Sequence, residues 1–408
     1  MRKDSITTPT SQDSKAMAIM DCLVGKFTPF YFVITMGIGI SAMVLHEFPI
    51  DCIRKGSKYV GIVYFFINIV AFCVIHILFF LRYMIWFHRY GDGQETFLKM
   101  IRNHQLSVFL GTEVMGSTTI INMIRVLEPG WYYFTYTLWV INCIFALLCA
   151  WVLVFVMLSN LCEFKLSDLI ATIYLPVVTI MVAASSGSSI NQTLTEYPTW
   201  QFANCIICYM LWCNALFMGC ILFPVYFQKQ YLTGLPTKAN VFSTFIPVGI
   251  LGQGSYGIVI AFNNFKEMLE RGHYESFFLG INVSEPDKLR NFIASFLHLS
   301  SVLIALFLLS MGVCMTMLAI FSIISYGNPG VWVKSMWAAT FPLGTMSTGF
   351  TALFTYTGLT GFQVMGTIYG TALILITTYC IIGTIVFEIP WKQMKEIIFE
   401  SRDIEKMV

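Results

Sequence analysis

Two short clusters in the sequence have the residue types and spacing of reactive sites. Cys205-Ile-Ile-Cys208 has the spacing of a redox or metal-binding cysteine pair. Gly252-Gln-Gly254-Ser-Tyr-Gly257 matches the GxGxxG pattern of dinucleotide sites. Both clusters lie inside long apolar stretches, where the cysteines have no His nearby and the glycines do not follow a strand. We interpret the cysteines as buried small side chains, and the glycines as sites of close helix packing or of exposed backbone.

One carboxylate, Glu113 in the sequence GTEVMG, lies deep in an apolar segment. Ionisable groups inside a membrane are costly and mark functional sites by default. Glu113 is therefore a candidate proton site. The alternative is a packed residue neutralised by protonation or by pairing with Arg125 or another cation. His76 and His298 lie in other apolar segments. Each is interpreted either as a proton relay or as a hydrogen-bonded core residue.

The stretch FPLGTMSTG, residues 341–349, interrupts another apolar segment. A proline within a helix leaves a carbonyl unpaired, which is tolerated at membrane depth only inside protein or beside a water-filled cavity. Phe341, Thr345, Thr348 and Gly349 share one helical face, so a single ring lies in a stripe of small and hydroxylic side chains. The stripe indicates either close helix packing or the wall of a central path, and we favour the path.

The composition places these residues in a membrane protein. Of the 408 residues 57% are hydrophobic and 11% are charged, against about 25% charged in a typical soluble domain. The mean hydropathy is +0.73, and apolar runs of about 20 residues, the length that spans a bilayer, recur along the chain. The net charge of +2 is too small to indicate a nucleic-acid partner. We predict an all-α integral membrane protein.

Ten apolar segments can be marked along the chain. They cover about residues 27–48, 59–81, 106–124, 131–158, 169–190, 199–227, 241–262, 292–325, 331–354 and 361–387. Because ten is even, both termini lie on one side of the membrane, where Lys and Arg are about twice as numerous as on the other. The positive-inside rule makes that side cytoplasmic.

This orientation divides the chain into a cytoplasmic N-terminal tail (1–26), a transmembrane domain (27–388) and a cytoplasmic C-terminal tail (389–408). The C-terminal tail has the pattern of a charged amphipathic helix at the membrane surface. The sequons at Asn191 and Asn282 both fall in loops that the orientation places outside, where glycans are added.

Glycine and proline distinguish the odd-numbered apolar segments from the even-numbered ones. The odd segments hold most of the glycines, whereas the even ones are bulky, as in YFFINIVAFCVIHILFF (64–80). Four prolines also lie in odd segments: Pro29, Pro176, Pro247 and Pro342. The pattern predicts five helical hairpins, with the odd helices forming an inner pseudo-five-fold ring around a central pore.

The lining expected for this pore is weakly polar, with few cations, which suits an anion that must pass without being trapped. The candidate lining residues are Gly37, Gly39, Ser185, Gly187, Gly252, Gly254, Ser255, Pro342, Gly344, Thr345 and Thr348. Lys334, near the start of the ninth segment, either reaches the headgroups or attracts anions to the inner mouth.

Five blocks spread along the chain resemble the tellurite-resistance/dicarboxylate transporter family. This family includes bacterial TehA-type channels, plant slow anion channels and fungal malate permeases. The blocks are TPFYFVITMGIGIS (28–41), VVTIMVAASSGS (177–188), GILGQGSYGIVI (249–260), WAATFPLGTMSTG (337–349) and VMGTIYG (364–370). The last three look closest to the fungal sulfite efflux branch. The resemblance extends over about residues 27–387.

This resemblance implies ten helices in five hairpins around a pore. In channel members a phenylalanine in a Thr-Phe-Pro block occludes the pore, and Phe341 is the matching residue. By the resemblance Phe341 is the gate, Pro342 supports a kink, and Gly344, Thr345 and Ser347 shape the adjoining wall. Bacterial relatives are trimers, so a homotrimer is implied. Glu113 departs from the family, whose members have an uncharged residue near this point.

The implied function is export of sulfite, as hydrogensulfite, from the cytosol through the plasma membrane. A proton-linked malate or dicarboxylate permease and a passive anion channel of the same family remain alternatives. A receptor or sensor without transport is less favoured because the predicted tails leave little room for a signalling domain. We expect no enzymatic activity, cofactor, metal or nucleic-acid partner.

Overall fold

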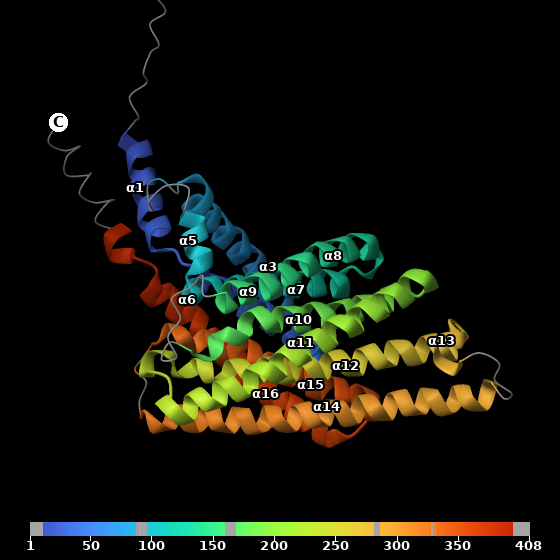
Figure 1. Ribbon diagram of the computed structural model, residues 1–408. Helices are drawn as coiled ribbons and strands as arrows, with labels where there is room; N and C mark the ends of the chain where they lie inside the picture. The colour runs from blue at the N-terminus through green and yellow to red at the C-terminus, as the bar shows by residue number, and fades with distance from the viewer. Residues whose placement is uncertain are drawn as a thin grey trace, which may run out of the picture.

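The computed structural model describes residues 11–86, 88, 96–159, 169–280, 286–327, 330 and 332–394. Throughout these ranges the regular structure is helical and no strand is formed, which confirms the all-α prediction (Figure 1). α1 (Ser11–Lys26) precedes the main bundle, so part of the predicted N-terminal tail is a helix.

Helices cover all ten apolar segments. The odd segments form α2 (Phe32–His46), α7 (Leu110–Leu127), α10 (Leu175–Ile190), α12 (Ile246–Glu270) and α15 (Thr340–Thr357). The even segments form α3 (Asp51–Phe80), α8 (Tyr132–Leu148) with its continuation α9 (Val154–Leu158), α11 (Pro198–Thr233), α14 (Pro286–Ser325) and α16 (Thr360–Gly383). Short helices α5 (Thr96–Arg102), α6 (His104–Ser107) and α13 (Glu275–Leu279) lie between them.

Eight helical stretches of the described residues are long and apolar enough to cross a membrane. α7 and α15 are the two predicted spans outside this set. α7 carries Glu113 and Arg125, and α15 is rich in threonine and glycine, which lowers the hydropathy of both. An integral membrane protein is therefore supported, while the count of ten spans stays a prediction.

Burial separates the helices into two groups. An apolar window of 18 residues within Ala171–Thr193, which contains α10, is fully buried, and the corresponding window within Lys238–Glu270, which contains α12, is 89% buried. By contrast, the corresponding windows of Asp51–Ile85 and Pro129–Leu158 on the outside are each 22% buried. Their exposed side chains are largely apolar, which suits contact with lipid. The small-residue segments are thus the enclosed ones, as their glycine content predicts.

The five small-residue helices close into a ring. α2 packs against α7, α7 against α10, α10 against α12, α12 against α15, and α15 back against α2. Each also contacts the even helix that follows it in the chain: α3, α8, α11, α14 and α16, respectively. We call α2, α7, α10, α12 and α15 the inner helices. Five-fold symmetry of this ring around an open pore remains a prediction.

The positions of the prolines contradict the prediction that proline kinks the inner helices. Pro176 and Pro247 are the second residues of α10 and α12, Pro342 is the third of α15, and Pro29 begins the 3-10 turn before α2. The first turn of a helix has no intrahelical partner for its N–H groups, so proline is tolerated there without a kink. The proline that does lie within a helix is Pro224, in the outer helix α11.

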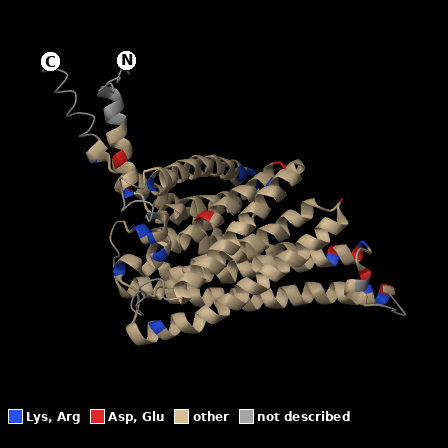
Figure 2. Ribbon diagram, turned by 45° about the horizontal axis from the view of Figure 1, so that its top comes forward, with Lys and Arg blue, Asp and Glu red and all other residues tan. Residues whose placement is uncertain are grey.

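Charged side chains lie mostly at the ends of the bundle, and its body is nearly free of them (Figure 2). The segments before and after the bundle, α1 and residues 391–394, meet at one end, where Cys22 Sγ donates to Gln393 Oε1 at 3.0 Å. This agrees with an even number of crossings between them. Residues 391–394 are helical, and the rest of the predicted C-terminal amphipathic helix lies outside the described residues.

Candidate functional site

A cavity of about 660 Å³ lies where the inner helices begin. Its lining includes the first turns or preceding residues of all five inner helices, among them Phe30, Val108, Ile173, Ser243 and Ala338. We call this space the inner cavity. The N-terminus of a helix is the positive end of its dipole, so the convergence of five N-termini favours an anion.

A smaller cavity of about 250 Å³, the outer cavity, lies at the far end of the same helices. Its lining includes Met43 of α2, Tyr256 of α12 and Thr351 of α15. The two cavities share no lining residue. At 1.5 Å per residue, about 8–10 Å of helix separates them on α2, α12 and α15.

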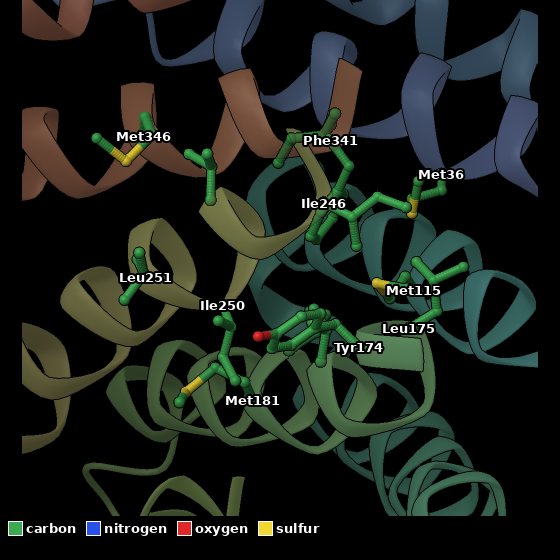
Figure 3. Close-up of a cluster of buried hydrophobic side chains, with 14 of the residues drawn as sticks. Met36, Met115, Tyr174, Leu175, Met181, Ile246, Ile250, Leu251, Phe341 and Met346 are labelled. Atoms are coloured by element: carbon green, nitrogen blue, oxygen red, sulfur yellow. The ribbon is translucent and has the colours of Figure 1, made fainter. Parts of the chain in front are cut away.

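The inner cavity narrows to an apolar collar at its deep end. The collar consists of Met36, Met115, Val178, Gly249 and Phe341, which lie at or next to the last lining position of their helices. Each inner helix contributes one residue, and the four side chains are at most 3% exposed. Figure 3 shows apolar side chains of this region, including Met36, Met115 and Phe341, gathered from the facing helices. Such a constriction opposes hydrated ions.

The ring of Phe341 fills space that a glycine leaves open. A Cβ built on Gly249 would lie 3.8 Å from Phe341 Cδ1, so α12 presents bare backbone to the ring. Phe341 is 3% exposed and is the second residue of α15, immediately after the 3-10 helix Lys334–Ala339. Phe341 thus lies between the inner cavity and the buried section of the bundle, which is where a ring that occludes the path is expected. The role of Phe341 as a gate stays a prediction.

The other predicted lining residues divide into two groups. Pro342 lines the inner cavity and Thr348 lines the outer one. The remaining ones line neither cavity: Gly37, Gly39, Ser185, Gly187, Gly252, Gly254, Ser255, Gly344 and Thr345. All of these lie on inner helices, most of them in the section between the two cavities.

Several of these glycines are positions of close helix contact. A Cβ on Gly37 would fall 2.5 Å from Thr340 Oγ1, and one on Gly252 would fall 2.6 Å from the carbonyl carbon of Thr345. Similar close contacts involve Gly39 with Thr119, Gly187 with Trp139, and Gly344 with Ile40. Their observed role is helix packing, and a role along a path between the cavities remains untested.

The section between the cavities contains polar side chains. Gln253 Nε2 donates to Ser185 Oγ across α12 and α10, and Gln253 Oε1 is buried without a partner among the described residues. The hydroxyls of Thr345 and Ser255 donate to carbonyls of their own helices. The sequence motif GQGS drew attention to the glycines, and the buried amide of Gln253 was missed.

Within the described part of the chain, the ionisable side chains that line the inner cavity are basic: His104, Lys229 and Lys334. Lys334 is paired, because its Nζ lies 2.8 Å from Glu388 Oε2 and 3.3 Å from the hydroxyl oxygen of Tyr31. It also lies over the Tyr31 ring, 4.6 Å from the centroid. Lys334 therefore borders the cavity as half of an ion pair, not as a free cation. Lys229, on α11, was not singled out from the sequence.

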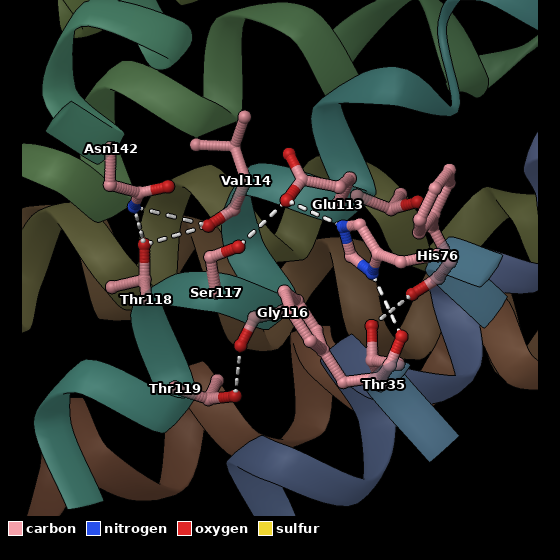
Figure 4. A network of polar contacts seen from close by, with 12 residues as sticks. Thr35, His76, Glu113, Val114, Gly116, Ser117, Thr118, Thr119 and Asn142 are labelled. Atoms are coloured by element: carbon pink, nitrogen blue, oxygen red, sulfur yellow. Dashed lines mark hydrogen bonds and ion pairs between the residues drawn. The ribbon is translucent and has the colours of Figure 1, made fainter. Parts of the chain in front are cut away.

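Glu113 lines neither cavity. Its Oε1 lies 3.3 Å from Nε2 of His76 on α3 and accepts a hydrogen bond from Ser117 Oγ at 2.8 Å (Figure 4). Figure 4 also shows that the Asn142 amide of α8 donates to the Thr118 hydroxyl oxygen and to the carbonyl oxygen of Val114, both on α7. The basic side chain beside Glu113 is thus that of His76, while Arg125 lines the outer cavity.

The contacts of His76 fix how many protons the pair holds. Nδ1 lies 2.8 Å from the carbonyl oxygen of Phe72, which accepts only, so Nδ1 carries a proton. The contact between Nε2 and Glu113 Oε1 then requires a second proton, either on His76 or on Glu113. His76 and Glu113 lie 37 positions apart on different hairpins, and no spacing in the sequence connects them.

The cysteine pair and one of the two sequons lie in the protein interior. Cys205 and Cys208 are buried on α11, as predicted. Asn191 is fully buried, with its amide nitrogen 2.9 Å from Cys205 Sγ and its amide oxygen accepting from Asn204. Enclosed in this way, the Asn191 side chain leaves no room for a glycan in the folded protein. Asn282 lies outside the described residues.

Comparison with known proteins assigns the family. Sulfite efflux pumps from fungi match most of the chain. The pump of Candida albicans is 30% identical over 93% of this chain and 77% of its own length. That of Saccharomyces cerevisiae is 25% identical over 89% and 88%, and that of Arthroderma otae is 27% identical over 85% and 86%. A family model described as voltage-dependent anion channel matches residues 26–385. The chain belongs to the voltage-dependent anion channel family.

Proposed function

We propose that the protein exports sulfite from the cytosol across the plasma membrane, through the ring of inner helices. The observation that carries this proposal is the pair of cavities at opposite ends of the ring. Among the described residues, the ionisable side chains that line the larger cavity are basic. Similarity to fungal sulfite efflux pumps supports sulfite as the anion.

The transported species is hydrogensulfite, the monoanion. The cost of removing an ion from water rises steeply with its charge, and the section between the cavities offers hydroxyl and amide groups in place of a full cation. When an anion is present, the hydroxyls of Ser185 and Thr345 and the amide nitrogen of Gln253 turn from their present acceptors toward it. This lowers the barrier for a monoanion without binding it so tightly that it cannot leave. A dianion crosses the same section with greater difficulty.

Phe341 is the proposed gate. The path runs from the inner cavity past the apolar collar, along the section of Ser185, Gln253 and Thr345, to Thr348 at the outer cavity. The collar blocks hydrated ions while the ring rests against Gly249. Rotation of the ring away from α12 opens the path, and the absence of a side chain on Gly249 leaves the ring room to turn.

The test is efflux from proteoliposomes preloaded with sulfite, with malate and chloride as competitors and an imposed pH gradient as a variable. We expect sulfite flux that malate competes with only weakly. The response to the pH gradient distinguishes coupled transport from passive transport, and electrical recording detects a channel through its larger currents. Malate flux without sulfite flux would assign the chain to the dicarboxylate permeases of the family instead.

The protein assembles as a homotrimer with one path in each subunit. The exposed apolar faces of the outer helices provide surface for contact with lipid and with other subunits. Native mass spectrometry of the purified protein measures the subunit number directly. A monomer in mild detergent and in nanodiscs would contradict the trimer without affecting the path, which lies within one chain.

A further inference from the structure

Lys229 is a buried cation that the transport path described above does not use. It lies in the last turns of α11, an outer helix, yet its side chain lines the inner cavity. The residue is only 4% exposed. Its position places an ammonium group in the wall of a cavity that also receives the first turns of five helices.

No hydrogen bond or ion pair of the Lys229 ammonium is formed with any part of the chain that the structure describes. The contrast with Lys334 is direct, because Lys334 reaches the carboxylate of Glu388 at 2.8 Å. No Asp or Glu is among the described residues that line the inner cavity. An ammonium group enclosed in protein without a partner is unfavourable, and a bound anion relieves the cost.

A second polar group in the same wall lacks a partner. The Ser243 hydroxyl oxygen is buried without a hydrogen bond among the described residues, and Ser243 belongs to the 3-10 helix that leads into α12. Buried polar groups are almost always satisfied by protein, water or ligand. Lys229 and Ser243 thus both line the inner cavity, and each has a hydrogen-bond donor that no described residue uses.

From these observations we infer that the inner cavity contains an anion-binding subsite at Lys229. Its ligand is a small oxyanion, which accepts hydrogen bonds from the ammonium group and, within the same cavity, from free donors such as the Ser243 hydroxyl. The subsite concentrates the anion before it meets the collar at Phe341. The inference rests on the proposed function for the identity of the anion, sulfite, and on the geometry alone for the presence of a site.

The variant Lys229→Gln removes the charge with little change in size, and Lys229→Arg keeps the charge. Lys238→Gln is the matched control, because Lys238 is exposed, lies near the same end of the bundle and does not line the cavity. In proteoliposomes we expect Lys229→Gln to raise the half-saturating sulfite concentration about tenfold or more, as for loss of a hydrogen bond to a charged group. Lys229→Arg and Lys238→Gln are expected to stay near the wild-type value.

A binding measurement separates the subsite from transport. Sulfite added to the detergent-purified protein should raise the midpoint of thermal unfolding of the wild type and of Lys238→Gln, and should leave that of Lys229→Gln unchanged. If Lys229→Gln does not fold, Lys229→Met replaces it in both measurements, because methionine introduces no buried amide that needs a hydrogen-bond partner.

The outcomes are distinguishable. If the wild type transports sulfite and Lys229→Gln has the same half-saturation and the same thermal shift, the subsite is overturned and the proposed function stands. If the wild type transports no sulfite while oxyanions still stabilise it through Lys229, the subsite stands and the proposed function falls. Equal stabilisation of every variant by chloride and sulfite would be a general salt effect and would also overturn the subsite.

Discussion

At the scale of single residues, Phe341 is the side chain whose removal should change transport most. Phe341→Ala deletes the ring that rests against Gly249 at the deep end of the inner cavity. We expect sulfite efflux per folded protein to rise about tenfold or more, equivalent to a barrier lower by about 1.4 kcal/mol. Efflux from preloaded proteoliposomes measures it.

Phe350→Ala is the control for this change. Phe350 lies on the same helix, is also buried at 6% exposure and lines neither cavity, because its ring packs against Tyr369 of α16 at 5.9 Å. Both variants lose a large buried ring, so both are expected to be less stable. Flux that rises equally in the two, or in neither, would remove Phe341 from the role of gate.

The pair formed by His76 and Glu113 should govern how transport depends on pH. It holds one proton between Nε2 and Oε1, and Glu113 is flanked on α7 by Thr112 and Met115, which line the inner cavity. A change in the proton number of the pair therefore changes the charge directly behind the cavity wall.

Glu113→Gln keeps a hydrogen bond to His76 and removes the acidic proton. We expect efflux at neutral pH to stay within about threefold of the wild type, because a neutral hydrogen bond contributes about 1 kcal/mol. The variation of efflux between about pH 5 and 8 should flatten to that produced by the equilibrium between hydrogensulfite and sulfite alone. His76→Gln should flatten it as well. Ser117→Ala, which removes one hydrogen bond to the same carboxylate, should keep the wild-type profile. A profile unchanged in all three would make the pair structural only.

At the scale of elements, the glycine-rich segments were correctly predicted to be enclosed, and for a physical reason. Close contact between helix backbones requires small residues, so glycine content reports burial inside a ring of helices. The contact of Gly252 with the α15 backbone is an example. The prolines were misread because the 3-10 segments before α10, α12 and α15 run directly into these helices, and composition does not mark where such a helix begins.

Gly252→Ala tests the close approach of α12 and α15. Its Cβ would lie 2.6–2.7 Å from backbone atoms of Thr345 and Met346, which cannot move aside without shifting the helix. Overpacking of this kind costs about 1–3 kcal/mol, so for a chain of this length we expect the midpoint of thermal unfolding to fall by roughly 1–4 °C.

Gly254→Ala, two positions away, provides the comparison. The nearest atoms to its Cβ are the ends of flexible side chains, Leu308 Cδ1 and Met181 Cε, both at 3.3 Å. Small adjustments of these groups accommodate a methyl group, and the midpoint should change little. Equal losses in the two variants would mean that backbone contact with α15 is not what requires glycine at 252.

Contacts between distant elements were beyond prediction from one sequence. Lys229 lies on a bulky outer helix, and its position in the wall of the inner cavity depends on how α11 packs against the 3-10 turn that begins α10. The same holds for His76 and Glu113, which different hairpins bring together. Hydropathy periodicity defines which face of a helix is buried, but not which charged group of another hairpin meets it.

At the scale of the whole molecule, the two ends of the ring differ in size and charge. The inner cavity is about 660 Å³ with basic ionisable lining residues, while the outer cavity is about 250 Å³ and is lined by both Glu47 and Arg125. A large basic vestibule collects anions, and a small mouth of mixed charge holds them less strongly, so the asymmetry favours entry at the inner end. Export therefore requires that the inner cavity face the cytosol.

Side-specific labelling tests this orientation. In a variant whose twelve cysteines are replaced by alanine or serine, Asn240→Cys places a thiol at an exposed position of the inner cavity, and Thr355→Cys places one at the outer cavity. A membrane-impermeant maleimide added to intact cells should label Thr355→Cys and reach Asn240→Cys only after permeabilisation. The reverse pattern would put the basic vestibule outside, where it collects anions for uptake, and the proposed direction of transport would be wrong even if sulfite is the substrate.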